Sequence, residues 1–189
     1  MWHSNSKYRK VIWQCNHKYG GDKVCSTPHF SEDELEQLFI SAANKVLPDR
    51  EGIIADFEGQ KDILFDTSEL QSQLFTLQDE LNVVAGLVEQ CVKENAHVAQ
   101  DQNEYRKRYE SLVERFNQAK RQIDEISDKI ADKNIRKGKL ENFLKTLASM
   151  PDIITTFDAL QFRLTVKYIT IYSKDDVRFT FWNGTEIKA

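Results

Sequence analysis

Residues 70–91 read LQSQLFTLQDELNVVAGLVEQC, and their apolar side chains recur in alternating steps of four and three residues. This spacing puts the side chains on one stripe of a helix, at the a and d positions of a heptad repeat. Three successive heptads exceed the pattern of an ordinary amphipathic helix, so the stretch favours a coiled coil. The stripe consists of Leu70, Leu74, Leu77, Leu81, Val84, Val88 and Cys91.

A second apolar stripe begins after the polar stretch 94–104 and belongs to a longer helix. Lys133 and Lys137 interrupt this stripe before it resumes. Two striped helices that follow each other across a polar link can fold back as a hairpin. The members of the second stripe are Tyr105, Tyr109, Leu112, Phe116, Ala119, Ile123, Ile126, Ile130, Leu140, Leu144 and Leu147.

The charges of the two helices indicate that they pair with each other. Residues 67–94 hold five Asp and Glu against a single base, Lys93, whereas residues 101–150 have a net charge of +3. Parallel self-pairing of the first helix would set acids against acids, but folding back sets them against bases. We therefore predict an antiparallel coiled-coil hairpin over 67–150, with its tip near 95–103 and its last turns packed on the rest of the protein.

A helix before the hairpin has a clear start signal. Ser31 is followed three residues later by Glu34, which is the pattern of a capping box. An apolar face then continues to Val46, and Pro48 ends or kinks the helix. A second short helix over 51–65 leads to the hairpin. The region 31–66 is thus predicted to be helical.

The segment 151–189 is typical of a short helix followed by a β-meander. Pro151 stops the preceding helix, a short helix is expected around 157–161, and strands follow over 165–172, 177–182 and 185–188. Asn183 and Gly184 are the preferred pair for a type I′ turn, which needs positive φ at both residues. Three strands alone leave an apolar face uncovered, so the meander should close onto the preceding helices. The predicted fold class is mainly α with a small antiparallel β part.

Composition indicates a helix-rich protein without a membrane span. The 189 residues include 30% charged residues but only seven Gly and three Pro, as expected for long regular elements. No apolar run approaches the roughly 20 residues that cross a bilayer. Because no signal peptide is evident either, we expect a cytoplasmic protein.

The net charge of −4 hides a strong segregation along the chain. Residues 1–30 have a net charge of +4, whereas residues 31–100 have a net charge of −11. A small basic and aromatic head on an acidic chain is what a phosphate-facing end looks like. A solvated run of charges has the same composition, so charge alone does not decide between the two.

Two cysteines of the basic head, Cys15 and Cys25, form half of a metal site. A structural zinc site takes four tetrahedral ligands, usually as two close pairs, and Cys91 lies far along the chain on the helical stripe. His17 and His29 could complete a mixed site, but their spacing matches no known zinc module. Reduced core thiols remain an alternative, and so does a disulfide, which an odd cysteine count disfavours. The pattern suggests a chain that starts partway through a domain.

No set of residues points to catalysis. The sequence has no Gly-rich phosphate loop, no acidic cluster at metal-ligand spacing and no nucleophile signature. Cys25 with His29 is a poor nucleophile pair, because nothing in the sequence activates the thiol or orients the imidazole. We expect this chain alone not to be an enzyme.

The combination and order of these parts resemble one protein family. The stretches IWQC (12–15), CSTPH (25–29), ENA (94–96), EYRKRY (104–109) and FTFWNGTEI (179–187) are similar to the C-terminal region of large serine recombinases. Those proteins are the site-specific integrases and transposon resolvases of bacteria and phages. The resemblance covers essentially the whole chain.

The resemblance implies that residues 1–30 are the second half of a zinc β-ribbon, and that the hairpin projects from a zinc-ribbon-like α+β body. Cys15 and Cys25 then correspond to the second pair of zinc ligands. The first Cys-x2-Cys and the serine-bearing catalytic domain of the family are not in this chain. Zinc is therefore expected in the intact parent domain, and weakly or not at all in this chain.

The resemblance also implies partners. DNA at a recombination site would be contacted by Lys7, Tyr8, Arg9, Lys10 and Lys18, and other recombinase subunits by the hairpin tip through Asn95, His97, Val98 and Gln100. The expected function is DNA binding and synapsis control in a serine site-specific recombinase, which serves DNA integration by a bacterial mobile genetic element. The alternative is a non-catalytic coiled-coil protein-interaction module with a small β cap, in which the two cysteines bind nothing.

Overall fold

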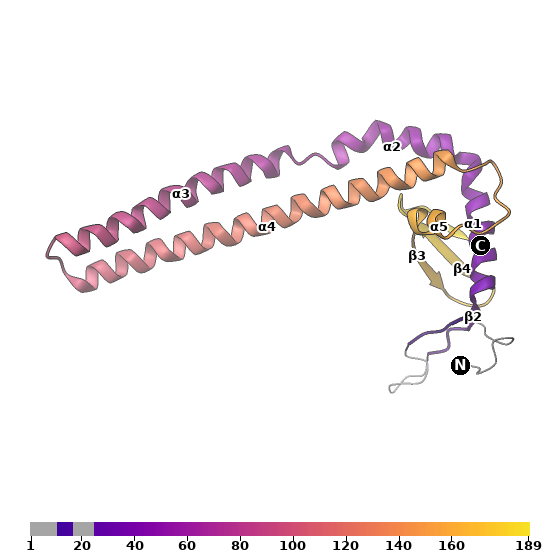
Figure 1. The fold of residues 1–189 in the computed structure, drawn as a ribbon, viewed down its shortest axis with the longest axis horizontal. Coiled ribbons are helices and arrows are strands. Elements are labelled where there is room, and N and C mark those ends of the chain that lie inside the picture. The colour runs from indigo at the N-terminus through magenta and orange to yellow at the C-terminus, as the bar shows by residue number, and fades with distance from the viewer. Residues whose placement is uncertain (1–10, 17–24) are drawn as a thin grey trace. The chain divides into compact units, whose positions relative to one another are not determined.

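The structure is a computed structural model, and it describes residues 11–16 and 25–189. These residues are mainly helical, with two small antiparallel sheets (Figure 1). The chain divides into two compact units: the hairpin unit, Lys61–Lys137, and the body, made of residues 1–60 and 138–189. The predicted fold class, mainly α with a small antiparallel β part, is confirmed. Its zinc-ribbon component stays a prediction.

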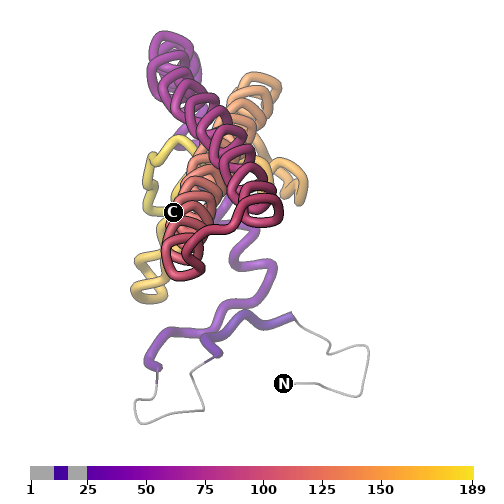
Figure 2. Tube along the Cα trace, turned by 90° about the vertical axis from the view of Figure 1, so that its left-hand side faces the viewer, coloured from indigo at the N-terminus to yellow at the C-terminus, as the bar shows by residue number. Residues whose placement is uncertain are grey.

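Two antiparallel helices form the hairpin unit. Helix α3 (Ser68–His97) and the first part of helix α4 (Gln102–Ser149) lie side by side and are joined by residues 98–101 (Figures 1 and 2). With 30 residues, α3 is about 45 Å long at about 1.5 Å per residue. The tip, residues 98–101, falls inside the predicted range of 95–103.

The predicted stripes form the contact between α3 and α4. On α3, Val84 and Cys91 are fully buried, and on α4 Ala119 and Ile126 are buried. Two ion pairs cross from one helix to the other, Arg115 Nε to Glu80 Oε1 and Arg108 Nη1 to Glu94 Oε2, each at 2.9 Å. Acids of the first helix thus meet bases of the second, as the charge pattern predicted.

Lys133, which interrupts the second stripe, closes the open end of the hairpin unit. Helix α2 (Arg50–Leu64) ends shortly before α3, and the Lys133 ammonium donates to the Asp66 carbonyl oxygen between them at 2.8 Å. The Asp66 carboxylate accepts the Ser68 hydroxyl at 2.6 Å and the Ser68 N–H at 2.9 Å. Both hydrogen bonds lower the pKa of Asp66, and the bond from the hydroxyl contributes more than the bond from the N–H. They also fix the first turn of α3.

Helix α1 (Glu32–Val46) of the body begins with the predicted capping box. The Glu34 N–H donates to Ser31 Oγ at 3.3 Å, and the Ser31 N–H donates to Glu34 Oε2 at 2.7 Å. The backbone bond from Ser31, followed by the hydrogen bond from Lys174, lowers the pKa of Glu34 from 4.5 to about 2. The helix ends where Pro48 enters a 3-10 turn, η2 (Leu47–Asp49), which passes directly into α2.

The predicted meander is present in the body. Strands β3 (Val166–Ile171), β4 (Val177–Phe181) and β5 (Glu186–Lys188) pair antiparallel in the order β3-β4-β5, and helix α5 (Ala159–Thr165) precedes them. A second, very short ladder joins β1 (Ile12–Trp13) to β2 (Phe30–Ser31). Each of the two sheets is antiparallel, as expected.

The predicted type I′ turn at Asn183-Gly184 is wrong. Gly184 has a φ of +89°, but no non-glycine residue of the described chain has a positive φ, so Asn183 does not fit that turn. The Gly184 N–H donates to the Phe181 carbonyl and the Phe181 N–H to the Thr185 carbonyl, both at 2.9 Å. This pattern is a three-residue loop with a bulge at the glycine. The Asn183 side chain accepts from the Thr185 N–H, which favours the wider loop.

The core of the body is aromatic. The fully buried Phe39 of α1 lies edge-on to Phe157 and Phe162, with ring centroids 5.8 and 5.3 Å away, and 6.2 Å from Phe179 of β4. The last turns of α4 contribute Phe143, whose ring lies 6.3 Å from that of Phe181. The end of α4 therefore packs into the body, as predicted.

Two polar side chains fasten the segment after α4 to the helices before the hairpin. The Asn44 side chain donates to the Ile154 carbonyl and accepts from the Ile154 N–H, both at 2.9 Å. Arg50 donates to the Met150 carbonyl and to the Asp152 carboxylate, both at 2.7 Å. Residues about a hundred positions apart in sequence are thus held together within the body.

Candidate functional site

The predicted metal ligands Cys15 and Cys25 lie near the short β1–β2 ladder. Cys15 follows β1 by two residues, and Cys25 precedes β2 by five. Both are half-buried thiols, and the Cys25 Sγ lies 3.0 Å from the Thr27 hydroxyl oxygen. Nearby, the Nε2 atom of His29 is buried and has no hydrogen-bond partner among the described residues.

The described residues show part of the ligand set that a structural zinc site needs. In residues 11–16 and 25–189, no three His, Cys, Asp or Glu side chains come together in a way that could hold a metal ion. Two thiolates supply half of the tetrahedral set that structural zinc requires. The third cysteine, Cys91, is buried in the α3 stripe of the hairpin unit, where the sequence placed it.

The predicted DNA-binding residues are Lys7, Tyr8, Arg9, Lys10 and Lys18, and they lie outside the described residues, as does His17. The described end of the head carries exposed apolar side chains instead, namely Val11, Ile12 and Trp13. The DNA-contact assignment therefore stays a prediction from the sequence.

Two of the predicted protein-contact residues of the hairpin tip, Asn95 and Gln100, contact each other. The Asn95 side-chain oxygen Oδ1 accepts a hydrogen bond from Gln100 Nε2 and another from Gln102 Nε2, each at 3.1 Å. These bonds tie the end of α3 to the start of α4. His97 and Val98 are exposed beside them, with 61% of Val98 accessible.

The start of α4 is fixed by Asp101, which the sequence reading missed. Its carboxylate accepts the N–H groups of Asn103 at 2.7 Å and Glu104 at 3.1 Å. Asp at an N-cap followed three residues later by Glu is a recognisable start signal, so the sequence contained the information. Hydrogen bonds therefore hold the loop at both ends, and Val98 is exposed between them.

Below the tip, Glu94 links the loop to the paired helices. Its carboxylate accepts from Gln90 at 2.7 Å and from Arg108 at 2.9 Å. The hydrogen bond from Gln90, and then that from Arg108, lowers the pKa of Glu94. Tyr105 and Tyr109 stack on each other with centroids 6.0 Å apart, and Tyr109 stays partly exposed at the edge of the stripe.

A groove of about 860 Å³ in the body was not predicted from the sequence. Strand β3 forms one wall along its whole length, and Trp13, Gln14 and Cys15 contribute to another. Leu35 and Phe162 are among its apolar lining residues, while Glu32, Glu36, Arg163 and Lys167 bring charge to it. The β-branched run in the sequence predicted a strand here, but not that among the described residues β3 pairs on one side alone, with β4.

None of the helices in the described part of the chain combines the length and the apolar character that crossing a bilayer requires. Comparisons with family models, with curated proteins and with solved structures gave no match to this chain.

Proposed function

We propose that this chain is a DNA-binding and synapsis-control region of a serine site-specific recombinase. The proposal rests on the order of parts in the chain: a basic head with two cysteines, a capped helix, a long antiparallel hairpin and a closing β-meander. The catalytic serine would be in another part of the intact protein. This chain then contributes recognition and assembly, and no chemical step.

The ordered hairpin tip is the observation that carries the proposal. A loop fastened by Asn95, Gln100 and Gln102, with Val98 exposed in its middle, suits a contact with another protein. Ordering before contact lowers the entropy lost on binding. The partner surface would be the hairpin of another recombinase subunit.

The DNA contact would come from the basic head. Lys7, Arg9, Lys10 and Lys18 can neutralise phosphates, and each neutralised phosphate releases counterions, which makes the affinity depend on salt. Tyr8 can hydrogen-bond to the backbone of the duplex. In the intact protein, zinc held by Cys15, Cys25 and an upstream pair of cysteines would stiffen this head, and no step of the proposal depends on the metal.

The tip assignment is tested in the intact recombinase with the double variant Val98→Glu/Gln100→Ala. We expect binding to a single recombination site to be unchanged and formation of the synaptic complex, measured on native gels, to fall at least tenfold. Val83→Ala is the matched control, because Val83 is exposed halfway along α3 and away from the tip. Unchanged synapsis and unchanged direction of recombination in the tip variant would show the assignment to be wrong.

The DNA assignment is tested with the triple variant Lys7→Ala/Arg9→Ala/Lys10→Ala of the same protein. Loss of three phosphate contacts should reduce the slope of log affinity against log salt by about 2.7, at about 0.9 per contact. Lys120→Ala, an exposed position on α4, removes a positive charge from the hairpin and should leave the slope unchanged. If the triple variant kept both affinity and slope, the interaction-module alternative would replace the DNA-binding proposal.

A further inference from the structure

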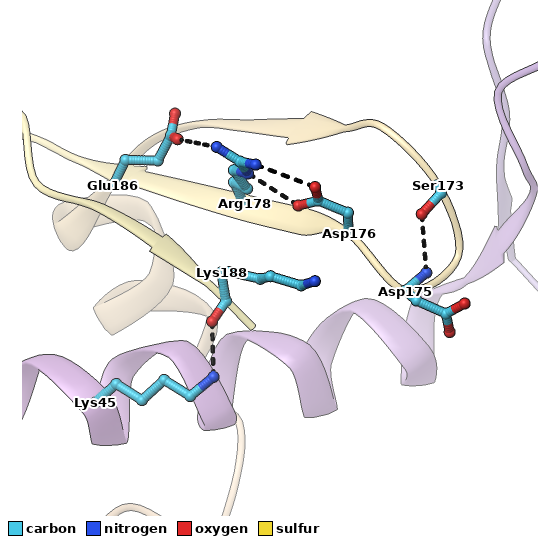
Figure 3. Close-up of polar contacts among 7 residues, drawn as sticks. All are labelled: Lys45, Ser173, Asp175, Asp176, Arg178, Glu186 and Lys188. Carbon is cyan, nitrogen blue, oxygen red and sulfur yellow. Dashed lines mark hydrogen bonds and ion pairs between the residues drawn. The ribbon is translucent and has the colours of Figure 1, made fainter.

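The two edges of the body's three-stranded sheet differ. At one edge, β5 is three residues long, and the Lys45 ammonium of α1 donates to the Lys188 carbonyl at 2.7 Å (Figure 3). On the sheet surface next to it, Arg178 binds the carboxylates of Asp176 and Glu186. These contacts protect the β5 edge in the ways expected of a natural edge strand.

The other edge, β3, is six residues long and rich in β-branched residues. The direction of its backbone groups follows from the register. Tyr172 donates to the Asp176 carbonyl at 2.9 Å, and Trp182 donates to the Thr165 carbonyl at 3.1 Å. Hydrogen-bonded pairs alternate along antiparallel strands, so Thr170 and Tyr168 also bond to β4.

Ile169 and Ile171 therefore direct their N–H and C=O groups away from β4. No hydrogen bond within the described chain reaches those groups. A row of unpaired backbone donors and acceptors is a template for another strand. The groove of about 860 Å³ runs along this same edge, and none of the described residues fills the space beside the unpaired groups.

The groove also has room and apolar surface for side chains. Ile169 and Ile171 share a face of the sheet with the buried Phe179 and Val177, their partners in the register. Leu35 and Phe162 line the groove on that side. A strand added here would place every second side chain against apolar residues and the others toward the solvent.

The groove carries opposite charges at its two ends, which constrains the charges of the added strand. Lys167 lies at the start of β3, and Arg163 lies in the last turn of α5 just before it. The end of β3 leads to Lys174, whose ammonium pairs with Glu34 near the start of α1 at 2.9 Å. The acidic residues Glu32 and Glu36 of the groove are thus near the end of β3. The occupant should be acidic beside Arg163 and basic beside Glu32.

From these observations we propose that β3 receives a fourth strand from another polypeptide. The partner is an extended segment with apolar residues at alternate positions, basic in its N-terminal half and acidic in its C-terminal half, that pairs antiparallel with β3. Main-chain hydrogen bonds to Ile169 and Ile171 supply affinity, and the groove selects the alternating side chains. This surface lies within the body and includes Trp13, Gln14 and Cys15 from the segment 1–30.

A displayed library of octapeptides with alternating apolar positions tests the proposal on the full chain. Selection is made against the wild-type protein, with Ile169→Pro as the counter-target. Proline at 169 removes an N–H that points away from β4, so the existing ladder is kept. Glu186→Pro places proline at the opposite edge, where the N–H also points away from β4, and it serves as the matched control.

We expect enriched peptides to carry the predicted charge order and to bind the wild type and Glu186→Pro equally, but Ile169→Pro at least tenfold more weakly, by fluorescence anisotropy. Absence of any peptide enriched on the wild type over Ile169→Pro would overturn the proposal. Enriched peptides that carry the opposite charge order would overturn the antiparallel assignment.

The peptide itself provides a second measurement that does not depend on how well Ile169→Pro folds. Two versions of one enriched peptide are N-methylated at alternate residues, one on each edge of its extended chain. Binding should be lost for the version methylated on the edge that faces β3 and kept for the other. Equal binding of both versions would mean an apolar pocket without strand pairing, and it would overturn the proposal.

The oligomeric state gives a separate check. A wild-type dimer that dissociates in Ile169→Pro, seen by sedimentation, would assign the edge to a second copy of this chain and would also overturn the proposal.

Discussion

The body and the hairpin unit are stabilised in different ways. In the body, Phe39, Phe143 and Phe179 are fully buried, and each packs against another aromatic ring. In the hairpin unit, two helices share a narrow stripe, and few of its side chains are fully enclosed, among them Val84 and Cys91. A two-helix contact leaves most of each helix in water, so its stability is spread over many small terms. The stability of the body therefore depends on a few large buried residues, and the stability of the hairpin unit depends on many small contacts repeated along the stripe.

The largest expected effect is in the body. Phe39→Ala removes the ring at the centre of the aromatic cluster and should lower the free energy of unfolding by about 3–5 kcal/mol. Trp13 and Trp182 belong to the body, and residues 61–137 contain no tryptophan, so tryptophan fluorescence during urea unfolding reports on this unit. Phe75→Ala, at a hairpin position that is 66% exposed, should change the free energy of unfolding by less than about 0.5 kcal/mol, as followed by far-UV circular dichroism. Equal effects of the two variants would contradict the difference between the units.

A medium effect is expected in the stripe of the hairpin, where two neighbouring valines form a matched pair. Val84 is 0% exposed and Val83 is 58% exposed. Val84→Ala should cost about 1.5 kcal/mol, at about 0.8 kcal/mol per buried methylene equivalent, as measured by far-UV circular dichroism during unfolding. Val83→Ala should be neutral or slightly stabilising, because alanine is the better helix former. A similar loss for both would mean that the stripe does not define the contact.

Acid should weaken the start of α1. The folded-state pKa of Glu34 is about 2, below its usual 4.5. Its contribution to stability is therefore fully present above pH 4.5 and is lost as the pH falls toward 2. Glu34→Gln should remove this part of the pH dependence when unfolding is followed between these values.

Ser31→Ala, which removes the other half of the capping box, should lower the free energy of unfolding by about 1 kcal/mol at neutral pH.

The smallest effect concerns the ion pair between Arg115 and Glu80. Both side chains are partly exposed, so a double-mutant cycle with alanine should give a coupling of about 0.5 kcal/mol. Repeating the cycle in about 1 M salt should remove most of the coupling, because the Debye length falls to about 3 Å. A coupling of several kcal/mol that resists salt would show the pair to be shielded from water, unlike the surface pair described here.

The sequence was informative wherever a local period or a local hydrogen bond decides the structure. The two stripes, the capping box at Ser31 and the meander follow from spacing and residue type alone. The contacts of Asn44 with Ile154 and of Arg50 with Met150 could not be predicted, because they join residues about a hundred positions apart. The turn at Gly184 was predicted with the wrong type, since the choice depends on the register of β4 and β5 and on the Asn183 side chain.

The candidate sites follow the same division. Residues of the hairpin tip were located by their position between the stripes, although the capping role of Asp101 was missed. The groove beside β3 could not be foreseen, because it combines segments before and after the hairpin. A strand is recognisable in a sequence, but whether its second edge is covered depends on distant parts of the chain.

The fastening of Arg50 to Met150 and of Asn44 to Ile154 has a consequence for how this protein can change in length. The chain segments on either side of the hairpin are clamped within the body, independently of what lies between them. Removing one heptad from α3 and one from the facing part of α4 would keep the stripe in register and leave both clamps in place. The length of the hairpin can thus change in matched steps of seven residues in each helix, while the fold of the body stays the same.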